Sequence, residues 1–339
     1  MAMTVIKSSS RWLLAAGLLA AAAPLHAAQI DPYLPNDAQW MLNVNVRQLL
    51  DSPIIKKYAL PTLQEKLKES KDAQDTLTSL GFDPLQDINS VTVAGPGVES
   101  DNQPKFLAII HGKFDVTKFQ AKAQEAAKDK DRLRIVQEGG YTLYQVPLPG
   151  GPQGGAQGSR ILYAAIIDES TLVFALDKDR VIDALDKKAG KKQANLAAEF
   201  SALLQNEDPT QSISFVILGN VLTKAAPDET VKEHVSTIKK VVGAIKIGSD
   251  VKLGMSIDNK DASAAKDLQD KIEQHVEQAK GAVELYREQL PMLAVVLDVL
   301  DVLKVNAKDR DVTIKAEVGA DKIDKALNKE NKAEKDKGK

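Results

Sequence analysis

TLVFALDKDRVIDAL, residues 171–185, contains the pattern that decides the fold. Its first six residues are mostly apolar, as expected for a buried β-strand. Asp179 follows after a short turn, and Val181, Ala184 and Leu185 then recur at the spacing of one helix face. The stretch predicts a strand that turns at an acidic corner into an amphipathic helix.

The same pattern occurs three more times. Apolar strands are expected at 106–111, 251–257 and 312–318, each followed by an aspartate and an amphipathic stretch; the four corner residues are Asp115, Asp179, Asp261 and Asp321. Aspartate at a helix start accepts free backbone N–H groups and suits the positive end of the helix dipole. We therefore expect these aspartates to cap helices rather than to bind metal or act as acids. Near-equal intervals, 64 residues from Asp115 to Asp179 and 60 from Asp261 to Asp321, indicate an internal duplication.

The remaining periodicity predicts an α+β fold of mostly antiparallel sheets packed by amphipathic helices. Further strands are expected at 39–46, 88–94, 105–111, 133–137, 141–146, 161–167 and 212–218, and helices at 53–68, 72–80, 228–245, 261–286 and 289–302. Pro61 should kink or break the first helix, and Gly81 should end the second. A Gly139-Gly140 turn should close a hairpin, and Gly95-Pro96-Gly97 should end a strand.

The chain divides into four parts on this basis. Residues 1–28 form a signal peptide, 29–208 an N-terminal α+β half, 209–328 a C-terminal α+β half, and 329–339 a tail without an apolar face, expected to be disordered. The signal peptide has Lys7 and Arg11, an apolar run at 12–23 and small residues at 27–28. Because spanning a membrane takes about 20 apolar residues, cleavage after Ala27 or Ala28 is favoured over a retained anchor, and the mature protein should be periplasmic or extracellular.

Composition excludes several functions. The chain has no cysteine, which excludes disulfides, thiolate metal sites and a cysteine nucleophile. Loss of Lys7 and Arg11 with the signal leaves 43 basic and 47 acidic residues, a net charge of −4, so the basic excess of a nucleic-acid-binding protein is absent. Aromatic residues are only 4% of the chain, which disfavours sugar-stacking and base-stacking surfaces.

Short motifs give no catalytic, cofactor or metal site. The glycine-rich loop at 150–158 lacks the lysine and hydroxyl of a P-loop. Ser236 and Lys239 form an isolated S-x-x-K without its companion motifs. His111, His234 and His275, the histidines outside the signal, are too far apart in sequence for a zinc motif. We expect His111 to be packed at a strand end, and the other two to be solvated on helices.

The most apolar segment after the signal is 290–303, LPMLAVVLDVLDVL, with Asp298 and Asp301 three residues apart. A buried core helix is the expected structure. A helix that faces lipid or forms the wall of an apolar cavity is the alternative, although its polar face is acidic rather than basic.

Four stretches resemble a family of exported bacterial proteins, common in planctomycete-type genomes, that has no assigned biochemical role. They are YLPND (33–37), VRQLLDSP (46–53), LGFDPLQDI (80–88) and GKFD (112–115). The likeness covers the N-terminal third, and it implies an exported location and an architecture but no catalytic residues.

The sequence therefore predicts an exported, non-enzymatic binding or scaffold protein of the periplasm or envelope, with an envelope or secreted partner and no nucleic acid. A hydrolase whose carboxylates or histidines meet only in three dimensions is one alternative, and a carrier of an apolar ligand is another. The hydrolase requires a cleft with a shifted pKa and an oriented partner. The carrier requires a continuous apolar pocket, and the binding module requires an exposed apolar patch.

Overall fold

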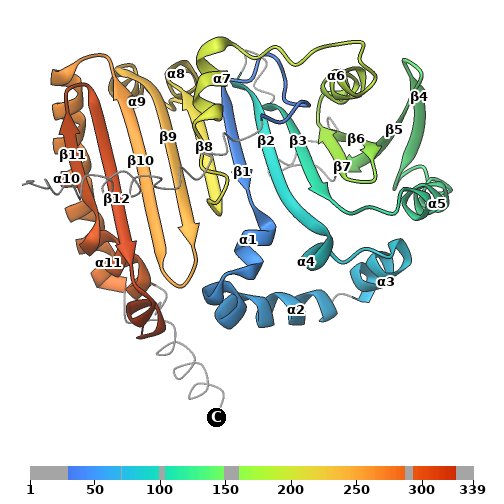
Figure 1. The fold of residues 1–339 in the computed structure, drawn as a ribbon, viewed down its shortest axis with the longest axis horizontal. Coiled ribbons are helices and arrows are strands. Elements are labelled where there is room, and N and C mark those ends of the chain that lie inside the picture. The colour runs from blue at the N-terminus through green and yellow to red at the C-terminus, as the bar shows by residue number, and fades with distance from the viewer. Residues whose placement is uncertain (1–29, 70, 99–103, 149–159, 287–292, 326–339) are drawn as a thin grey trace, which may run out of the picture.

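A computed structural model of the chain describes residues 30–69, 71–98, 104–148, 160–286 and 293–325. Its centre is one twelve-stranded sheet in which all neighbouring strands are antiparallel (Figure 1). The strand order is β11-β12-β10-β9-β8-β1-β2-β3-β7-β6-β5-β4. The expected signal peptide, the glycine-rich loop 150–158 and the tail 329–339 lie outside the described residues, as do residues 290–292 of the apolar segment.

The strands are β1 (Trp40–Val44), β2 (Ile88–Val98), β3 (Pro104–Gly112), β4 (Arg134–Glu138), β5 (Tyr141–Leu148), β6 (Arg160–Asp168), β7 (Thr171–Ala175), β8 (Ile213–Leu218), β9 (Ile238–Ile247), β10 (Val251–Asn259), β11 (Lys304–Lys308) and β12 (Asp311–Val318). The helices are α1 (Val46–Asp51), the π-helix η1 (Ile55–Ala59), α2 (Leu60–Glu69), α3 (Lys71–Leu80), α4 (Pro84–Asp87), α5 (Val116–Ala126), α6 (Lys178–Lys188), α7 (Ala198–Gln205), α8 (Gly219–Ala225), α9 (Glu229–Val235), α10 (Ala262–Tyr286) and α11 (Leu293–Val302). The α+β prediction is confirmed at this level.

The chain crosses the sheet in two runs that meet at the β1–β8 pair. Strands β1 to β7 lie on one side of this junction and β8 to β12 on the other, as the colours of Figure 1 show. Counted outward from the β1–β8 pair, the strands of the first run follow in the order β1, β2, β3, β7, β6. Those of the second run follow in the matching order β8, β9, β10, β12, β11. The expected division near residues 206–211 therefore coincides with the connection that precedes β8.

One cross-strand row relates the two sides. Directly opposed residues continue from strand to strand across nine strands; this central row is Val173, Ile109, Thr92, Asn43, Ser214, Ala244, Gly254, Lys315 and Lys304. Opposed residues in an antiparallel sheet point to the same face. The row therefore defines one face of the sheet, called here the first face.

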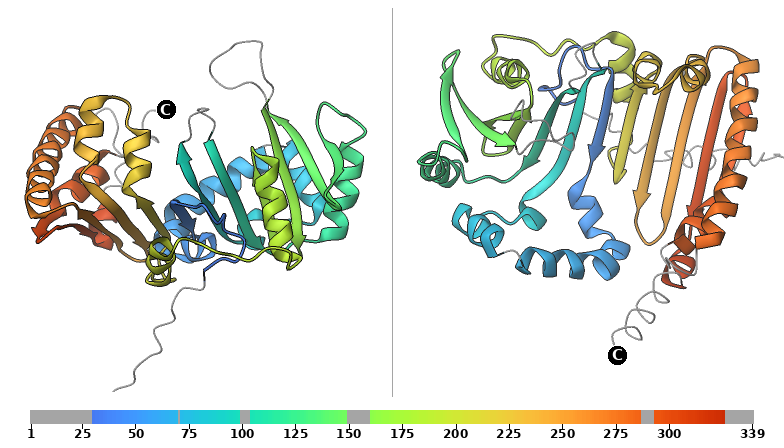
Figure 2. Two further views of the ribbon diagram at one scale, coloured as in Figure 1. Left: turned by 90° about the horizontal axis from the view of Figure 1, so that it is seen from above. Right: turned by 180° about the vertical axis from the view of Figure 1, so that it is seen from behind.

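Helices cover opposite faces on the two sides. On the β1–β7 side, α6 and α7 pack on the first face, where Val181 and Phe200 join Ile109 and Val173 in the larger core. On the β8–β12 side, Ala265 of α10 packs with a smaller core on the other face. Seen from behind (Figure 2, right), α10 and α11 lie across β11 and β12.

Strand β12 shows the effect of this change in the covered face. Its residues alternate strictly between exposed or half-buried and buried. The buried residues Val312 and Ile314 face α10, so Lys315 is left on the open first face. The strand expected at 312–318 is therefore present, and it is buried on one face only.

The segment 228–245 was expected to be one helix, and this prediction is wrong. The chain forms the short helix α9, then turns at Ser236 and continues as strand β9. Its apolar residues at Val231, Val235 and Ile238 fit a helical spacing, but the β-branched run after residue 238 pairs with β8 and β10.

The expected turn at Gly95-Pro96-Gly97 is also wrong. All three residues are buried inside β2, where the pairing with β3 shifts register. A Cβ on Gly95 would lie 2.2 Å from the Lys105 carbonyl oxygen, and Gly97 has a φ of +96° against Val221 of α8. Close backbone approach, not chain reversal, therefore requires these glycines.

The remaining boundaries agree more closely. Gly81, with a φ of +61°, ends α3, and Gly139 and Gly140 form the β4–β5 turn with positive φ. Pro61 does not end the helical stretch; it is the second residue of α2, directly after η1. No helix among the described residues is both long and apolar enough to cross a membrane.

Two of the four corner aspartates are caps, as expected. Asp115 Oδ1 accepts the Lys118 N–H at 3.0 Å, and Asp261 Oδ1 accepts the Ala264 N–H at 2.9 Å. At α6 the cap is Asp177, which accepts the Asp179 N–H, so Asp179 lies in the first turn. Asp321 is likewise inside the first turn of the helical residues 320–325. All four still lie at helix starts, where acidic side chains suit the dipole.

Candidate functional site

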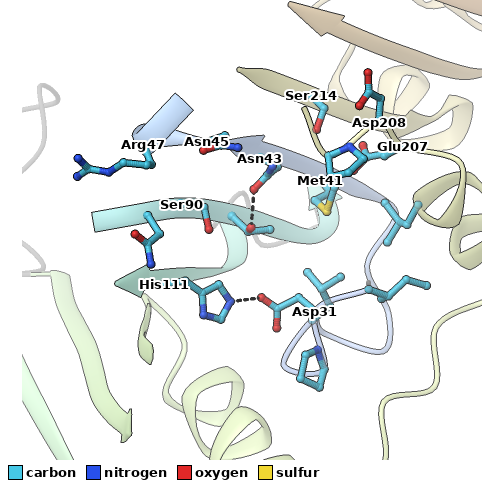
Figure 3. Close-up of a pocket in the computed structure, with 17 residues that line it drawn as sticks. Asp31, Met41, Asn43, Asn45, Arg47, Ser90, His111, Glu207, Asp208 and Ser214 are labelled. Carbon is cyan, nitrogen blue, oxygen red and sulfur yellow. Dashed lines mark hydrogen bonds and ion pairs between the residues drawn. The ribbon is translucent and has the colours of Figure 1, made fainter. Parts of the chain in front are cut away.

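A cleft of about 620 Å³ lies on the first face, where the two runs of strands meet. Its floor is formed by β8, β1, β2 and β3, and its walls are the segment 30–34 and the residues after α7 (Figure 3). Amide and hydroxyl side chains, charged side chains and apolar side chains line the cleft in similar numbers; the apolar ones are Ile30, Pro32, Leu34, Met41, Leu204 and Pro209.

The polar floor follows the central row. Asn43, Thr92 and Ser214 are directly opposed on β1, β2 and β8. Thr92 Oγ1 donates to Asn43 Oδ1 at 2.9 Å, which orients the Asn43 amide group and leaves its NH₂ to donate (Figure 3). The same row is apolar one strand further on, at Ile109. A local change from apolar to polar residues therefore marks the cleft.

His111 lies at one end of the cleft with both ring nitrogens engaged. Nε2 is 2.6 Å from Asp31 Oδ2, and Nδ1 is 3.2 Å from Thr171 Oγ1. The hydrogen bond with Asp31 raises the pKa of His111 above its usual value and outweighs the opposing effect of burial. The pair forms because the chain before β1 crosses the end of β3.

Glu207 lies at the other end, just after α7. Burial raises its pKa to about 7, although a hydrogen bond with Ser214 acts in the opposite direction. Its Oε1 atom is buried and has no hydrogen-bond partner among the described residues. A buried carboxyl group without an ion partner is expected to hold its proton to higher pH.

The ends of the cleft also differ in fixed charge. Arg47 Nη2 donates to the Leu85 carbonyl oxygen at 2.8 Å, which holds the guanidinium at the rim of the cleft (Figure 3). Asp208 is next to Glu207, and hydrogen bonds from Thr210 lower the pKa of Asp208. The cleft therefore has a cation toward one end and a carboxylate toward the other.

The two titratable ends are too far apart to act on one atom. His111 is on β3, and Ser214, the partner of Glu207, is on β8. Three strand spacings separate them, roughly 14 Å at about 4.8 Å each. Paired catalytic carboxyl groups of glycosidases are separated by about 5–9.5 Å.

The other residues considered from the sequence are not brought to the cleft. His234 contacts the Thr230 carbonyl oxygen within α9, and His275 lies 3.3 Å from Gln278 Oε1 on the exposed side of α10. Ser236 and Lys239 lie on either side of the α9–β9 turn. Among the described residues, no group of three His, Cys, Asp or Glu side chains could hold a metal ion.

The sequence pointed to His111 but not to its partners. Asp31 is 80 residues away from His111 in the chain, and Glu207 comes from a connecting loop. The alternation of asparagines at 43 and 45 in an otherwise apolar strand was the available signal for the floor. Comparisons with protein-family models, curated proteins and solved structures found no match.

Proposed function

We propose that this is an exported, non-enzymatic binding protein whose cleft holds a small polar ligand with separated positive and negative groups. The observation that carries the proposal is the polar floor at Asn43, Thr92 and Ser214, with Arg47 toward one end and Asp208 toward the other. A negative ligand group would pair with Arg47, and a positive group with Asp208. Amides and hydroxyls between them can donate and accept hydrogen bonds.

The separation of opposite charges sets the class of ligand. Arg47 and Asp208 both line the cleft and lie toward different ends of it (Figure 3). An extended peptide of about three residues carries its positive and negative termini about 10 Å apart, at about 3.3–3.6 Å per residue. A short zwitterionic peptide is therefore a suitable probe of the cleft.

The hydrolase alternative is supported in part, and the same peptide probe distinguishes it from the binding protein. His111 has an oriented partner and a raised pKa, as a catalytic histidine would. However, the hydroxyl that contacts His111 belongs to Thr171, which is 2% exposed and does not reach a ligand. Ser90, directly opposite His111 on β2, does line the cleft, but His111 has no ring nitrogen left to activate it. Both ring nitrogens of His111 are already used within the protein.

Isothermal titration calorimetry of the full chain tests the proposal with triglycine, citrate and spermidine. We expect triglycine to bind and the purely anionic and cationic probes to bind much more weakly. Arg47→Gln should weaken triglycine binding by about tenfold, the effect of about 1.4 kcal/mol. Arg132→Gln, in an exposed turn, is the matched control.

Two outcomes would contradict it. Absence of heat with triglycine excludes the proposed ligand class. Release of glycine during the titration, detected as new amino groups, would instead establish the hydrolase.

The carrier alternative has less support. Residues 301–303 of the apolar segment line a second hollow, but that hollow combines apolar side chains with four lysines, Asp301 and Glu317, so it is not a continuous apolar pocket. The large exposed apolar residues are dispersed over β1, α2, α9, α10 and α11 rather than gathered on one element; they are Leu42, Leu63, Val231, Leu285 and Val296.

We also infer that the two runs of strands arose by duplication. Two observations support the duplication. The two runs have a common order outward from the β1–β8 junction, and the stretches 171–185 and 312–325 hold equivalent positions, each crossing from a strand into a helix. The opposite faces buried by β7 and β12 require that the halves have since diverged. Export would place residues 29–328 outside the cytoplasm. N-terminal sequencing of the secreted protein tests this proposal, and the sequence should start at residue 28 or 29.

A further inference from the structure

A second hollow, of about 840 Å³, lies on the first face beside the cleft. Four neighbouring strands each contribute one lysine to it; the residues are Lys246 of β9, Lys252 of β10, Lys315 of β12 and Lys304 of β11. Figure 1 looks onto these strands without a helix in front of β9 and β10, because α10 and α11 lie behind the sheet. We call this feature the lysine hollow.

The four lysines form two directly opposed pairs. Lys246 is opposite Lys252, and Lys304 is opposite Lys315. All four point to the same face, because Gly254 lies opposite Lys315 and two residues from Lys252. Like charges in directly opposed positions destabilise a sheet, so this arrangement has a cost that packing does not explain.

Only part of this charge is neutralised within the protein. Lys252 Nζ is 3.0 Å from Asp250 and 3.1 Å from Glu317, and Lys246 Nζ contacts the hydroxyl of Thr210 at 3.2 Å. Lys304 and Lys315 form no ion pair with any described residue. Of the acidic residues in the lining, Asp301 also contacts Lys280 at 3.6 Å.

The floor of the hollow is open because its central residue has no side chain. Nothing lies within 4 Å of the place where a Cβ of Gly254 would be. Glycine weakens a strand interior and often marks a place where a ligand or another backbone approaches closely. At this position no other part of the described chain makes that approach.

Protection of the sheet edge does not explain the whole group. Lysines on an edge strand oppose pairing with another chain, and Lys304 and Lys308 of β11 fit that role. Lys246 and Lys252 are on interior strands with partners on both sides. Four lysines beside a bare floor instead offer several point charges to one anion.

We propose that the lysine hollow binds a small soluble anion that carries at least two phosphate groups. The protein as a whole has a formal net charge of −2, so the positive hollow is a local arrangement rather than a result of composition. The hollow adjoins the cleft: Gln211 lines the hollow, Asp208 lines the cleft, and the charge of Lys246 helps to lower the pKa of Asp208.

Isothermal titration calorimetry of the full chain with sodium tripolyphosphate at low salt tests the proposal. We expect saturable one-site binding that weakens as salt is raised. The double variant Lys304→Gln/Lys315→Gln should bind at least about tenfold more weakly, because each lost charge removes a direct ion pair. Gly254→Met should abolish binding by filling the floor, with an unchanged circular dichroism spectrum.

Lys308→Gln is the matched control. Lys308 is on the same strand and face as Lys304, but roughly 13 Å further along at about 3.4 Å per residue, and it does not line the hollow. Its substitution should change the dissociation constant less than twofold.

Three results would overturn the proposal. The first is the absence of heat with tripolyphosphate. The second is that Lys308→Gln weakens tripolyphosphate binding as much as the double variant does. The third is that the protein cosediments with phosphatidylglycerol vesicles but does not bind tripolyphosphate. The last result would assign the lysines to a lipid surface instead of a soluble anion.

Discussion

The two ends of the central row lie on the same face of one sheet, yet they have opposite environments. Ile109 and Val173 are fully buried beneath α6. Gly254 and Lys315, at the other end, face open space and solvent. A strand does not by itself determine which of its faces is buried; the helix that packs against it does. The polar cleft lies between these ends, where neither set of helices covers the sheet completely.

The largest test of this comparison replaces one residue at each end. Ile109→Ala removes a fully buried side chain and should lower the free energy of unfolding by about 2–5 kcal/mol. Lys315→Ala, on the same row, should change it by less than about 0.5 kcal/mol. Urea unfolding followed by circular dichroism measures both, and similar losses would show that the open end is packed.

Glu207→Gln tests the region between the ends. Burial raises the pKa of Glu207 from 4.5 to about 7, so the folded protein keeps a proton that the unfolded chain releases. The contribution of this proton to the free energy of unfolding is fully present below pH 4.5 and is lost as pH rises through about 7. At pH 8 the ionised Glu207 therefore lowers the free energy of unfolding by about 3 kcal/mol.

The Gln variant lacks this cost and should be more stable than the native chain at pH 8, with little difference at pH 4.5. Urea unfolding at both values measures the change. Glu199→Gln, exposed on α7, is the control and should retain the native pH dependence. An equal pH dependence in the Glu207→Gln variant would show that Glu207 is hydrated.

Two glycines on adjacent strands sharpen the contrast between covered and open faces. A Cβ on Gly243 would lie 2.3 Å from the Phe215 ring, on the face that α10 covers, whereas Gly254 points to the open face. Gly243→Ala should lower the free energy of unfolding by about 1–3 kcal/mol, because the added methyl group overpacks the site. Gly254→Ala should be neutral or slightly stabilising, because alanine restricts the unfolded chain. Thermal unfolding compares them, and a loss at Gly254 would contradict an open hollow.

The smallest expected effect concerns the rim of the cleft. The hydrogen bond with Asp31 raises the pKa of His111, so its stabilisation is present below the unfolded value near 6.5 and disappears as pH rises through the higher folded value. Asp31→Asn should cost less than about 1 kcal/mol at pH 6, since the His111 side chain is 32% exposed and solvent screens the pair.

NMR titration of the His111 ring protons measures this change directly, and the pKa should fall in the Asp31→Asn variant. Asp129→Asn, in an exposed turn, should leave the titration unchanged. If both variants titrate as the native chain does, Asp31 does not hold the imidazole in solution.

Local patterns predicted the elements but not their relations. The strand-then-aspartate pattern indicated β12, and the Gly139-Gly140 pair indicated the β4–β5 hairpin, because both signals lie within a few residues. Residues 228–245 were mistaken for one helix because Val231, Val235 and Ile238 fit the helical period, and only pairing with β8 and β10 selects the strand.

The cleft could not be predicted for a related reason. Its residues come from β1, β2, β3, β8 and the loop after α7, and their meeting depends on the strand order. The contact between His111 and Asp31 requires the chain before β1 to cross β3, which no local pattern encodes. Likewise, the four lysines are unremarkable in sequence, and only the register of β9 to β12 places them together.

The sheet is open, so β11 ends it with one row of backbone N–H and C=O groups that no described strand satisfies. Such an edge can template the addition of a strand from another molecule. Lys304 and Lys308, exposed on this short strand, oppose that addition because an incoming copy of β11 would bring the same charges against them. The charged margin therefore opposes the pairing of two β11 edges.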